Sequence, residues 1–145
     1  MGRQFALGVD YGTNSVRALV VDLETGAEIA EDVVDYPSGE AGILLDPKDP
    51  NLARQNPADY LTGFEQSVKN AVAAARDVDG FTPEAVVGIG VDTTGSTPIP
   101  VNRDGTALAM LEGFREELSA GAWLWKDHTS HAEAEEISAA ADRQG

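Results

Sequence analysis

The sequence has 145 residues, 42% hydrophobic and 24% charged, which corresponds in length to about one domain and in composition to a globular protein. Its formal net charge of −15 argues against nucleic acid or an anionic membrane as the main partner, because both bind clustered cations. There is no cysteine, which excludes disulfides and cysteine-ligated metal sites and favours a reducing compartment.

No targeting segment is apparent in the sequence. The apolar run Phe5–Val9 is short and ends at Asp10, unlike the core of a signal peptide. The longest other apolar run, Ala85–Val91, is too short to cross a bilayer. We therefore expect a soluble, cytoplasmic protein.

The first third of the chain predicts an antiparallel meander. Runs rich in β-branched residues, Phe5–Val9 and Arg17–Val21, flank the turn-forming stretch 10–16, which indicates a hairpin. A turn at 24–26 then leads into a third predicted strand at 27–34.

The middle of the chain predicts a loop followed by a helix. Four of the seven prolines fall between Tyr36 and Pro57, which favours an irregular surface loop. Asn56 is a suitable N-cap with Pro57 at the first helical position, and the helix is expected to end near Gly80. Its apolar face is predicted to comprise Leu61, Phe64, Val68, Ala71, Val72 and Ala75.

The remaining elements complete a fold prediction. The continuous apolar run Val86–Val91 predicts a fully buried central strand parallel to the first. The segments 97–101 and 106–111 predict a second hairpin, and a capping box at Ser130–Glu133 predicts a helix to about Asp142. Three meandering strands, a helix and a parallel strand are the order of an α/β, ribonuclease-H-like mixed sheet, whereas the strand–helix alternation of a Rossmann domain is absent.

Neither a P-loop nor a dinucleotide-binding glycine motif is present, so the first candidate site is the hairpin Asp10–Arg17. Its turn has a glycine and several polar side chains, which can offer N–H and hydroxyl groups to a phosphate, while Asp10 can hold Mg²⁺ through water. An ordinary polar hairpin, with Asp10 bonded to its own turn, explains the composition of this stretch at least as well.

The second candidate site combines two segments. Asp92–Ser96 follows a strand at its carboxyl end, where open sheets present ligand sites, although a polar exit from the strand with Asp92 as a cap is an equal alternative. Trp125 precedes two charged residues, and an indole ring can stack on a sugar while charges reach the hydroxyls. We expect Trp123 to belong to the core.

Two further polar groups are more simply explained as solvated surface. His128 and His131 are three residues apart but have no third ligand at a suitable spacing, so a metal site is not expected. The acidic residues Glu133, Glu135 and Glu136 are expected to form an exposed helix face.

Three segments together resemble the FGGY carbohydrate kinases of the actin-like ATPase superfamily: Asp10-x-Gly-Thr-x-Ser-x-Arg17, Gly88–Pro98 and Trp125–Thr129. The resemblance extends over essentially the whole chain and implies ATP and Mg²⁺ as cofactors, with Asp10 supporting the metal. It implies that the residues facing the ATP phosphates are Gly12, Thr13, Asn14, Ser15 and Arg17. The implied sugar-binding residues are Gly95, Ser96, Trp125, Lys126 and Asp127.

Position 129 narrows the sugar that the resemblance implies. Many FGGY kinases have Trp-x-Asp-x-Arg here, whereas this sequence has Thr129 in place of the arginine. That departure resembles the subgroup that phosphorylates L-ribulose, so we expect L-ribulose or a related ketopentose as substrate.

The resembling kinases are much longer, and the resemblance implies that a catalytic base, an adenosine pocket and a second phosphate loop lie in sequence beyond Gly145. We therefore expect residues 1–145 to be a truncated N-terminal ribonuclease-H-like domain without the second lobe, without a catalytic residue and inactive alone. A homodimer is compatible with this expectation. The alternatives are a non-catalytic acidic binding module, the first lobe of another actin-like ATPase, or an FGGY kinase for a different sugar.

Overall fold

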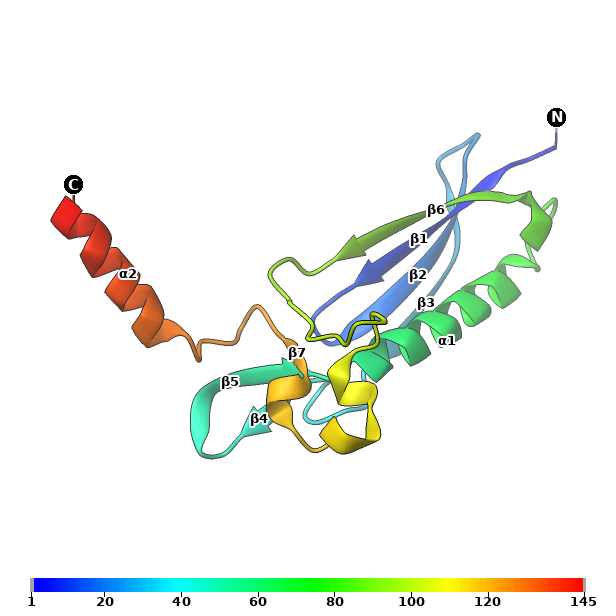
Figure 1. Ribbon diagram of the computed structural model, residues 1–145. Coiled ribbons are helices and arrows are strands. Elements are labelled where there is room, and N and C mark those ends of the chain that lie inside the picture. Colours follow the sequence, from blue (N-terminus) through cyan, green and yellow to red (C-terminus); the bar gives the residue numbers. More distant parts are fainter. Residues whose placement is uncertain (1, 145) are drawn as a thin grey trace.

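The main body of the molecule is a four-stranded mixed sheet with one long helix packed on it, in a computed structural model that describes residues 2–144 (Figure 1). The strand order is β3-β2-β1-β6. β1 (Phe5–Tyr11) and β2 (Ser15–Asp22) form a hairpin, and β3 (Glu28–Asp35) pairs antiparallel with β2. β6 (Val86–Thr93) runs parallel to β1. The predicted meander and the predicted parallel strand are therefore confirmed.

The helix α1 (Pro57–Ala75) begins where the sequence indicates, because the Asn56 side chain accepts a hydrogen bond from the Ala58 N–H at 3.1 Å. It ends at Ala75, before the predicted Gly80, and hydrogen-bonded turns follow it. Leu61 is 58% exposed, so its predicted place on the buried face is wrong.

Small residues form the buried face of α1. Gly63, Ser67, Ala71 and Ala75 recur every fourth position and are buried, whereas the predicted Phe64, Val68 and Val72 are only half-buried. A Cβ atom at Gly63 would lie 2.6 Å from Val16 Cγ1. The helix backbone therefore approaches the sheet closely, against the alternating buried residues of β1 and β2: Phe5, Leu7, Val9, Val16, Ala18 and Val20.

The strand β6 is at the edge of the sheet and exposed, so the prediction of a buried central strand is wrong in this respect. Val87, Ile89 and Val91 are 57%, 61% and 61% exposed. Within residues 2–144, α1 packs chiefly on β2 and β3, and β6 has β1 as its one strand neighbour. Its apolar sequence indicates a strand suited to burial, but no described element covers it.

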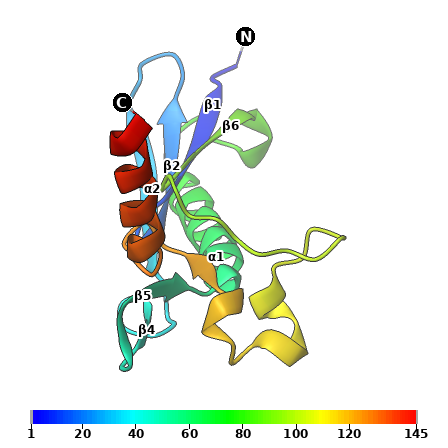
Figure 2. The same cartoon turned by 60° about the vertical axis from the view of Figure 1, so that its left-hand side comes forward.

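The segment 36–57 contains two strands of a second sheet, which corrects the prediction of an irregular loop. β4 (Leu44–Asp46), β5 (Asp49–Gln55) and β7 (Ala122–Trp123) form an antiparallel sheet in the order β4-β5-β7. Figures 1 and 2 show this sheet at the end of the main sheet where α1 begins. Local proline content misled the prediction, because β5 is paired with a strand from far along the chain.

The predicted hairpin over 97–111 is reduced to a turn. Asn102 Oδ1 accepts hydrogen bonds from the Asp104 and Thr106 N–H groups, both at 2.9 Å, and one isolated bridge joins Val101 to Ala107. The short 3₁₀ helices η2 (Leu108–Met110), η3 (Glu112–Phe114) and η4 (Leu118–Ala120) follow; another, η1 (Pro83–Ala85), precedes β6.

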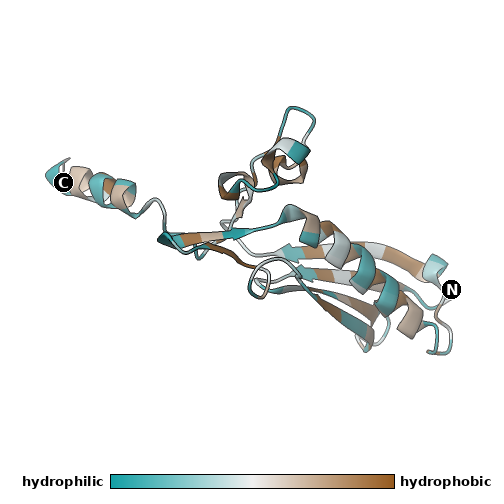
Figure 3. Cartoon of the chain, turned by 90° about the horizontal axis from the view of Figure 1, so that it is seen from below, coloured by the Kyte–Doolittle hydropathy of each residue, from teal (hydrophilic) through white to brown (hydrophobic). Residues whose placement is uncertain are grey.

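The final helix α2 (His131–Gln144) confirms the helix expected near the C-terminus. It projects away from the rest of the molecule (Figures 1 and 3). As predicted, His128 and His131 are exposed, and so are Glu133, Glu135 and Glu136. Among residues 2–144, no helix is long and apolar enough to span a membrane.

The predicted domain extends over residues 1–145, but its two terminal residues, Met1 and Gly145, lie outside the described residues. The catalytic base was predicted in sequence beyond Gly145. The structure therefore does not test that prediction, and the placement of the base stays a prediction.

The close approach at Gly63 predicts that Gly63→Ala destabilises the fold. The added methyl group would meet Val16 Cγ1 at 2.6 Å, and overpacking of this kind costs about 1–3 kcal/mol, against a gain of about 1 kcal/mol in helix propensity. Urea denaturation should show a lower midpoint than for the unchanged chain. In the control Gly88→Ala, the added Cβ has no atom within 4 Å, and its midpoint should not fall. An unchanged or higher midpoint for Gly63→Ala would contradict the close packing.

Candidate functional site

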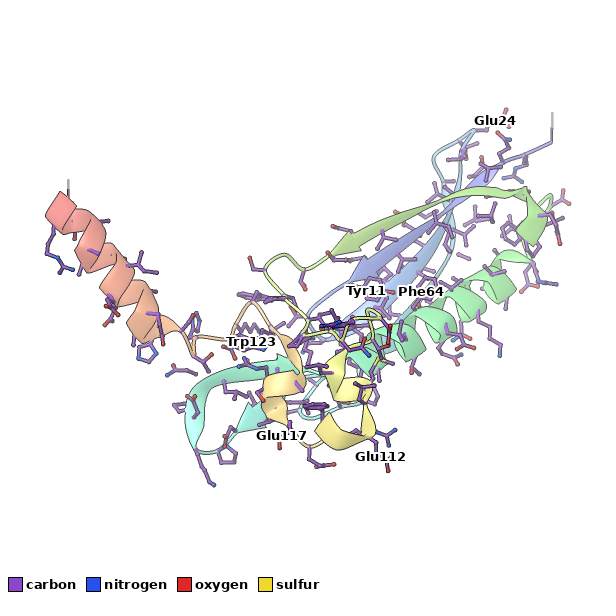
Figure 4. The ribbon with its side chains drawn as sticks, viewed as in Figure 1. Tyr11, Glu24, Phe64, Glu112, Glu117 and Trp123 are labelled. Atoms are coloured by element: carbon purple, nitrogen blue, oxygen red, sulfur yellow. The ribbon has the colours of Figure 1, made fainter. Side chains whose placement is uncertain are left out.

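The β1–β2 turn lies at the sheet end where β1 and β6 finish and where the small sheet begins. The Gly12 N–H donates to the Ser15 carbonyl at 2.9 Å and closes the turn, and the Thr94 N–H donates to the Tyr11 carbonyl at 3.1 Å beyond β6. Figure 4 shows Tyr11 at this end of β1 and Trp123 on β7. The candidate segments Asp10–Arg17 and Asp92–Ser96 therefore lie at the same end of the sheet, at the carboxyl ends of β1 and β6.

Gln55 supports the turn from behind. Its side chain is 1% exposed, with Nε2 donating to the Thr13 carbonyl at 2.7 Å and Oε1 accepting from the Tyr60 hydroxyl at 2.8 Å. Burial, assisted by the charge of Asp59, raises the pKa of Tyr60 to about 12, so this hydroxyl remains a donor at neutral pH. Sequence reasoning missed Gln55 because it lay in the predicted loop.

Three tyrosines pack beneath this end of the sheet. Tyr60 makes edge-to-face contacts with Tyr36 and Tyr11, with ring centroids 5.5 Å and 6.1 Å away. The Tyr36 ring is buried and its hydroxyl has no partner among the described residues, and burial raises the pKa of this group. The aromatic cluster gives Gln55 and the turn a rigid support.

Trp125 contacts the turn directly. Its indole Nε1 donates to Thr13 Oγ1 at 3.0 Å, although the two residues are 112 positions apart. The indole is 51% exposed, and Lys126 Nζ lies 5.2 Å from the ring centroid. One predicted sugar-binding residue and one predicted phosphate-binding residue are thus in contact.

The Asp127 carboxylate is occupied by its own protein. Oδ2 accepts from the Ala53 N–H at 2.8 Å and forms a buried ion pair with Arg54, while Oδ1 accepts from the Thr129 N–H and hydroxyl at 3.1 Å and 2.5 Å. These bonds give Asp127 a structural part in shaping the segment around Trp125. Thr129, which stands where many FGGY kinases have an arginine, donates both of these last two hydrogen bonds.

Arg54 is buried between Asp127 and an aromatic ring. Its guanidinium carbon lies 3.9 Å from the centroid of Trp123, and burial lowers the pKa of Arg54, against the opposing charge of Asp49. Trp123 is only half-buried, so it forms a stacking surface for Arg54, which corrects its prediction as a core residue.

The predicted sugar segment borders a pocket of about 420 Å³ together with the Trp125 wall. Ser96, Trp125 and Asp127 are among the residues that line it. Gly95 and Ser96 are exposed after β6, and Ser96 has φ of 57°, in the left-handed region. The pocket is open to solvent beside the Trp125 ring.

Asp10 and Arg17 lie apart from Trp125, on the sheet face away from α1. They are cross-strand partners, and Asp10 is also aligned with Asp92 of β6. The three line a pocket of about 480 Å³ that also includes the glycines Gly8 and Gly90. The exposed Asn14 side chain does not line this pocket, and its Nδ2 donates a hydrogen bond to the Ala41 carbonyl at 2.6 Å.

The predicted residues therefore fall into two neighbouring groups. Thr13 and Trp125 are joined by a hydrogen bond, while Asp10 and Arg17 flank the other side of the hairpin. No cluster of three or more histidine, aspartate or glutamate side chains suited to a metal occurs within the described part of the chain. A metal ion here would have to take oxygen ligands from its substrate or from water as well.

Comparison with known proteins defines the class. The N-terminal domain of the FGGY family of carbohydrate kinases matches residues 5–144, and the chain belongs to this family. Among curated relatives, it is 42% identical over 136 residues to a ribulokinase of Vibrio parahaemolyticus, which covers 94% of this chain and 23% of that protein. It is 36% identical over 152 residues to a ribulokinase of Geobacillus thermodenitrificans, covering 100% of this chain and 26% of the relative. The chain thus spans about a quarter of the length of these relatives.

Solved structures show the same fold at low sequence identity. A gluconate kinase from Lactobacillus acidophilus matches with a TM-score of 0.70 and 15% identity, over 99% of this chain and 24% of its own. A xyloylose kinase from Brucella ovis has a TM-score of 0.70 and 21% identity, over 96% of this chain and 24% of its own. These similarities confirm the predicted mixed α/β fold of the sugar kinases.

The buried ion pair predicts a large stability loss when Asp127 is removed. Both side chains are at most 5% exposed, and Asp127→Ala leaves the Arg54 charge buried without a partner, which costs about 3–5 kcal/mol. Urea denaturation should show this loss. The double variant Arg54→Met/Asp127→Ala should recover part of it, since no unpaired charge then remains. The control Asp104→Ala, at an exposed turn, should change stability little. Equal midpoints for Asp127→Ala and the unchanged chain would contradict the ion pair's importance.

Proposed function

We propose that this chain is the N-terminal part of a longer ATP-dependent kinase that phosphorylates L-ribulose or a closely related ketopentose. The similarity to two ribulokinases over nearly the whole chain supports the choice of sugar. The observation that carries the assignment to a site is the hydrogen bond from Trp125 to Thr13, 3.0 Å long. This bond supports the proposal because it joins Trp125, which we assign to the sugar, to Thr13, which we assign to the phosphates.

In this proposal the chain supplies part of each binding site. Trp125 offers an exposed ring to the sugar, and Lys126 lies close to that ring. Ser96 lines the adjoining pocket, and the exposed Gly95 precedes it in the chain. Asp127 contributes by fixing this wall, because its oxygens are bonded to the protein. A ring held in place before the sugar arrives loses less freedom on binding.

The hairpin is the proposed phosphate-binding element. Gly12, Thr13, Asn14 and Ser15 form its turn, and Arg17 follows on β2. Phosphoryl transfer depends mainly on positioning and on stabilising the negative charge that shifts during reaction. Backbone N–H groups and the Arg17 guanidinium are suited to that charge.

Mg²⁺ is the metal that the kinase assignment implies, and the residues beside Arg17 fit it. Asp10 and Asp92 are exposed carboxylates at aligned positions of two parallel strands, and carboxylate oxygens are ligands that Mg²⁺ prefers, often through water. When bound, the ion would neutralise phosphate charge. Asp10 is the residue we propose to hold it.

An assay of the complete polypeptide tests the function. ADP release, followed by a coupled enzyme reaction, should depend on L-ribulose and be weaker with D-xylulose, glycerol or gluconate. The 145-residue chain alone should release no ADP, because we propose that the catalytic base lies in sequence beyond Gly145. A complete polypeptide without ketopentose-dependent turnover would refute the proposal, and a rate for the 145 residues matching the complete polypeptide would refute the proposed division of the site.

Replacing Asp10 should impair the phosphate side of the reaction selectively. Asp10→Asn in the complete polypeptide should lower kcat by about 10-fold or more, as expected for loss of a charge that acts on the transferring phosphoryl group. The KM for the sugar should stay nearly constant, since Asp10 lies apart from Trp125. The exposed Asp104→Asn is the matched control and should keep full activity. Calorimetry separates this result from general destabilisation, and an unchanged kcat with an unchanged melting temperature would refute the proposed part of Asp10 in phosphoryl transfer.

A further inference from the structure

Two consecutive residues at the end of β5 contact the two parts of the candidate site, which are the sugar wall at Trp125 and the phosphate hairpin at Thr13; we call these parts the two half-sites. Arg54 and Gln55 are 3% and 1% exposed, and their side chains have different partners. Arg54 pairs with Asp127, on the segment that carries Trp125. Gln55 donates to the carbonyl of Thr13 at 2.7 Å, in the hairpin turn.

Thr13 accepts hydrogen bonds from both Gln55 and Trp125, so it links β5 to the Trp125 segment. Its carbonyl accepts from Gln55 and its Oγ1 accepts from Trp125. The Trp125 segment is in turn fixed to β5, because Arg54 and Gln55 are in register with Trp123 and Ala122 of β7. The Leu124 N–H also donates to the Ala53 carbonyl at 3.1 Å. A shift of β5 therefore moves both ends of the contact between Thr13 and Trp125.

Neither residue is free to meet a ligand. Gln55 uses its amide oxygen for Tyr60 and its amide nitrogen for Thr13, while Arg54 is enclosed by Asp127 and the Trp123 ring. The buried Gln55 amide, whose oxygen and nitrogen are both bonded, fixes the geometry of its partners. Arg54 acts through its ion pair and its ring contact, since its Nε has no hydrogen-bond partner among the described residues. Their action on a ligand must pass through Thr13 and Trp125.

We propose that Arg54 and Gln55 are positioning residues that fix the distance and orientation between the candidate sugar wall at Trp125 and the candidate phosphate hairpin at Thr13. The kinetic consequence of this proposal depends on the proposed kinase function, whereas the structural consequence does not. In a reaction between two bound substrates, a displacement of about 1 Å lowers the rate by about 100-fold. A strand that spans both half-sites is a direct means of preventing it.

The structural consequence is tested by ¹⁹F NMR of the complete polypeptide labelled with 5-fluorotryptophan. The Trp125 resonance is assigned by its loss in Trp125→Phe. Gln55→Leu has similar volume but lacks both hydrogen bonds, so Thr13 is released and the Trp125 resonance should shift or broaden. Gln66→Leu is the matched control: the same substitution on the exposed side of α1, where Gln66 bonds only to Asn70 at 2.7 Å. It should leave the resonance unchanged.

Further variants keep the test decisive if Gln55→Leu fails to fold. Tyr60→Phe removes only the donor to Gln55 Oε1 and should give a smaller change of the Trp125 resonance in the same direction. Arg54→Lys retains the charge beside Asp127, and should disturb the resonance less than Arg54→Met. If the folded Gln55 or Tyr60 variants keep the Trp125 resonance of the unchanged protein, the inference is overturned, whatever the enzyme's activity.

Kinetics of the same variants test the consequence for the reaction. Gln55→Leu should lower kcat by about tenfold or more, because it misaligns the two bound substrates, and should change the KM for the sugar by less than about twofold. A merely structural loss would lower the melting temperature and leave kcat per folded molecule unchanged. If the resonance shifts but the complete protein phosphorylates no ketopentose, the proposed function fails while the positioning role stands. If the kinase is active and the kcat of Gln55→Leu equals that of the unchanged protein, the kinetic consequence of the proposal is refuted.

Discussion

The buried ion pair between Arg54 and Asp127 is the constraint on which the arrangement of the candidate site depends. It joins residues 73 positions apart. The folded state requires this pair, because a charge left unpaired in the interior would cost several kcal/mol of stability. The pair brings the segment around Trp125 to β5. It is strengthened by the backbone N–H of Ala53 and by Thr129, which occupy the remaining lone pairs of the carboxylate.

With that segment fixed, the site becomes a meeting of three distant parts of the chain. The hairpin comes from the start of the sequence, β5 from the middle and the tryptophan wall from near the end, and Thr13 is the residue that contacts the other two. The small-residue face of α1 contributes indirectly. By allowing the helix close to the sheet, it brings Tyr60, near the start of the helix, to the position from which it bonds Gln55.

The sequence was sufficient for the elements whose signals are local. The turn after Asp10, the N-cap at Asn56 and the alternation of β1 and β2 each depend on neighbouring residues, and the structure confirms them. β5 escaped prediction because its local partner, β4, is three residues long and lies in the same proline-containing segment, while its other partner, β7, is two residues long and nearly 70 residues away. Val86–Val91 was identified as a strand but not as an exposed one, since a continuous apolar run indicates suitability for burial and not the presence of a covering element.

The candidate site shows the same division. Residue types and spacing pointed to Thr13 and Trp125 separately, but not to their contact, which requires the tertiary fold. The bonding of Asp127 also could not be predicted. The sequence Trp125-Lys126-Asp127 does not show whether the aspartate oxygens bind a ligand or an arginine of the same chain. Gln55 carries no motif signal at all, and only its bonds in the folded chain distinguish it.

The exposed strand β6 has a consequence for how this chain behaves in isolation. One of its edges has backbone N–H and C=O groups that no described strand satisfies, and its side chains Val87, Ile89 and Val91 are largely open to water. Such an edge is a template on which another extended segment can add as a new strand. The two glycines at 88 and 90 weaken the β propensity of the strand and so disfavour that addition. Handling of the isolated 145 residues at high concentration is therefore governed less by the well-packed helix face than by the unpaired apolar edge of β6.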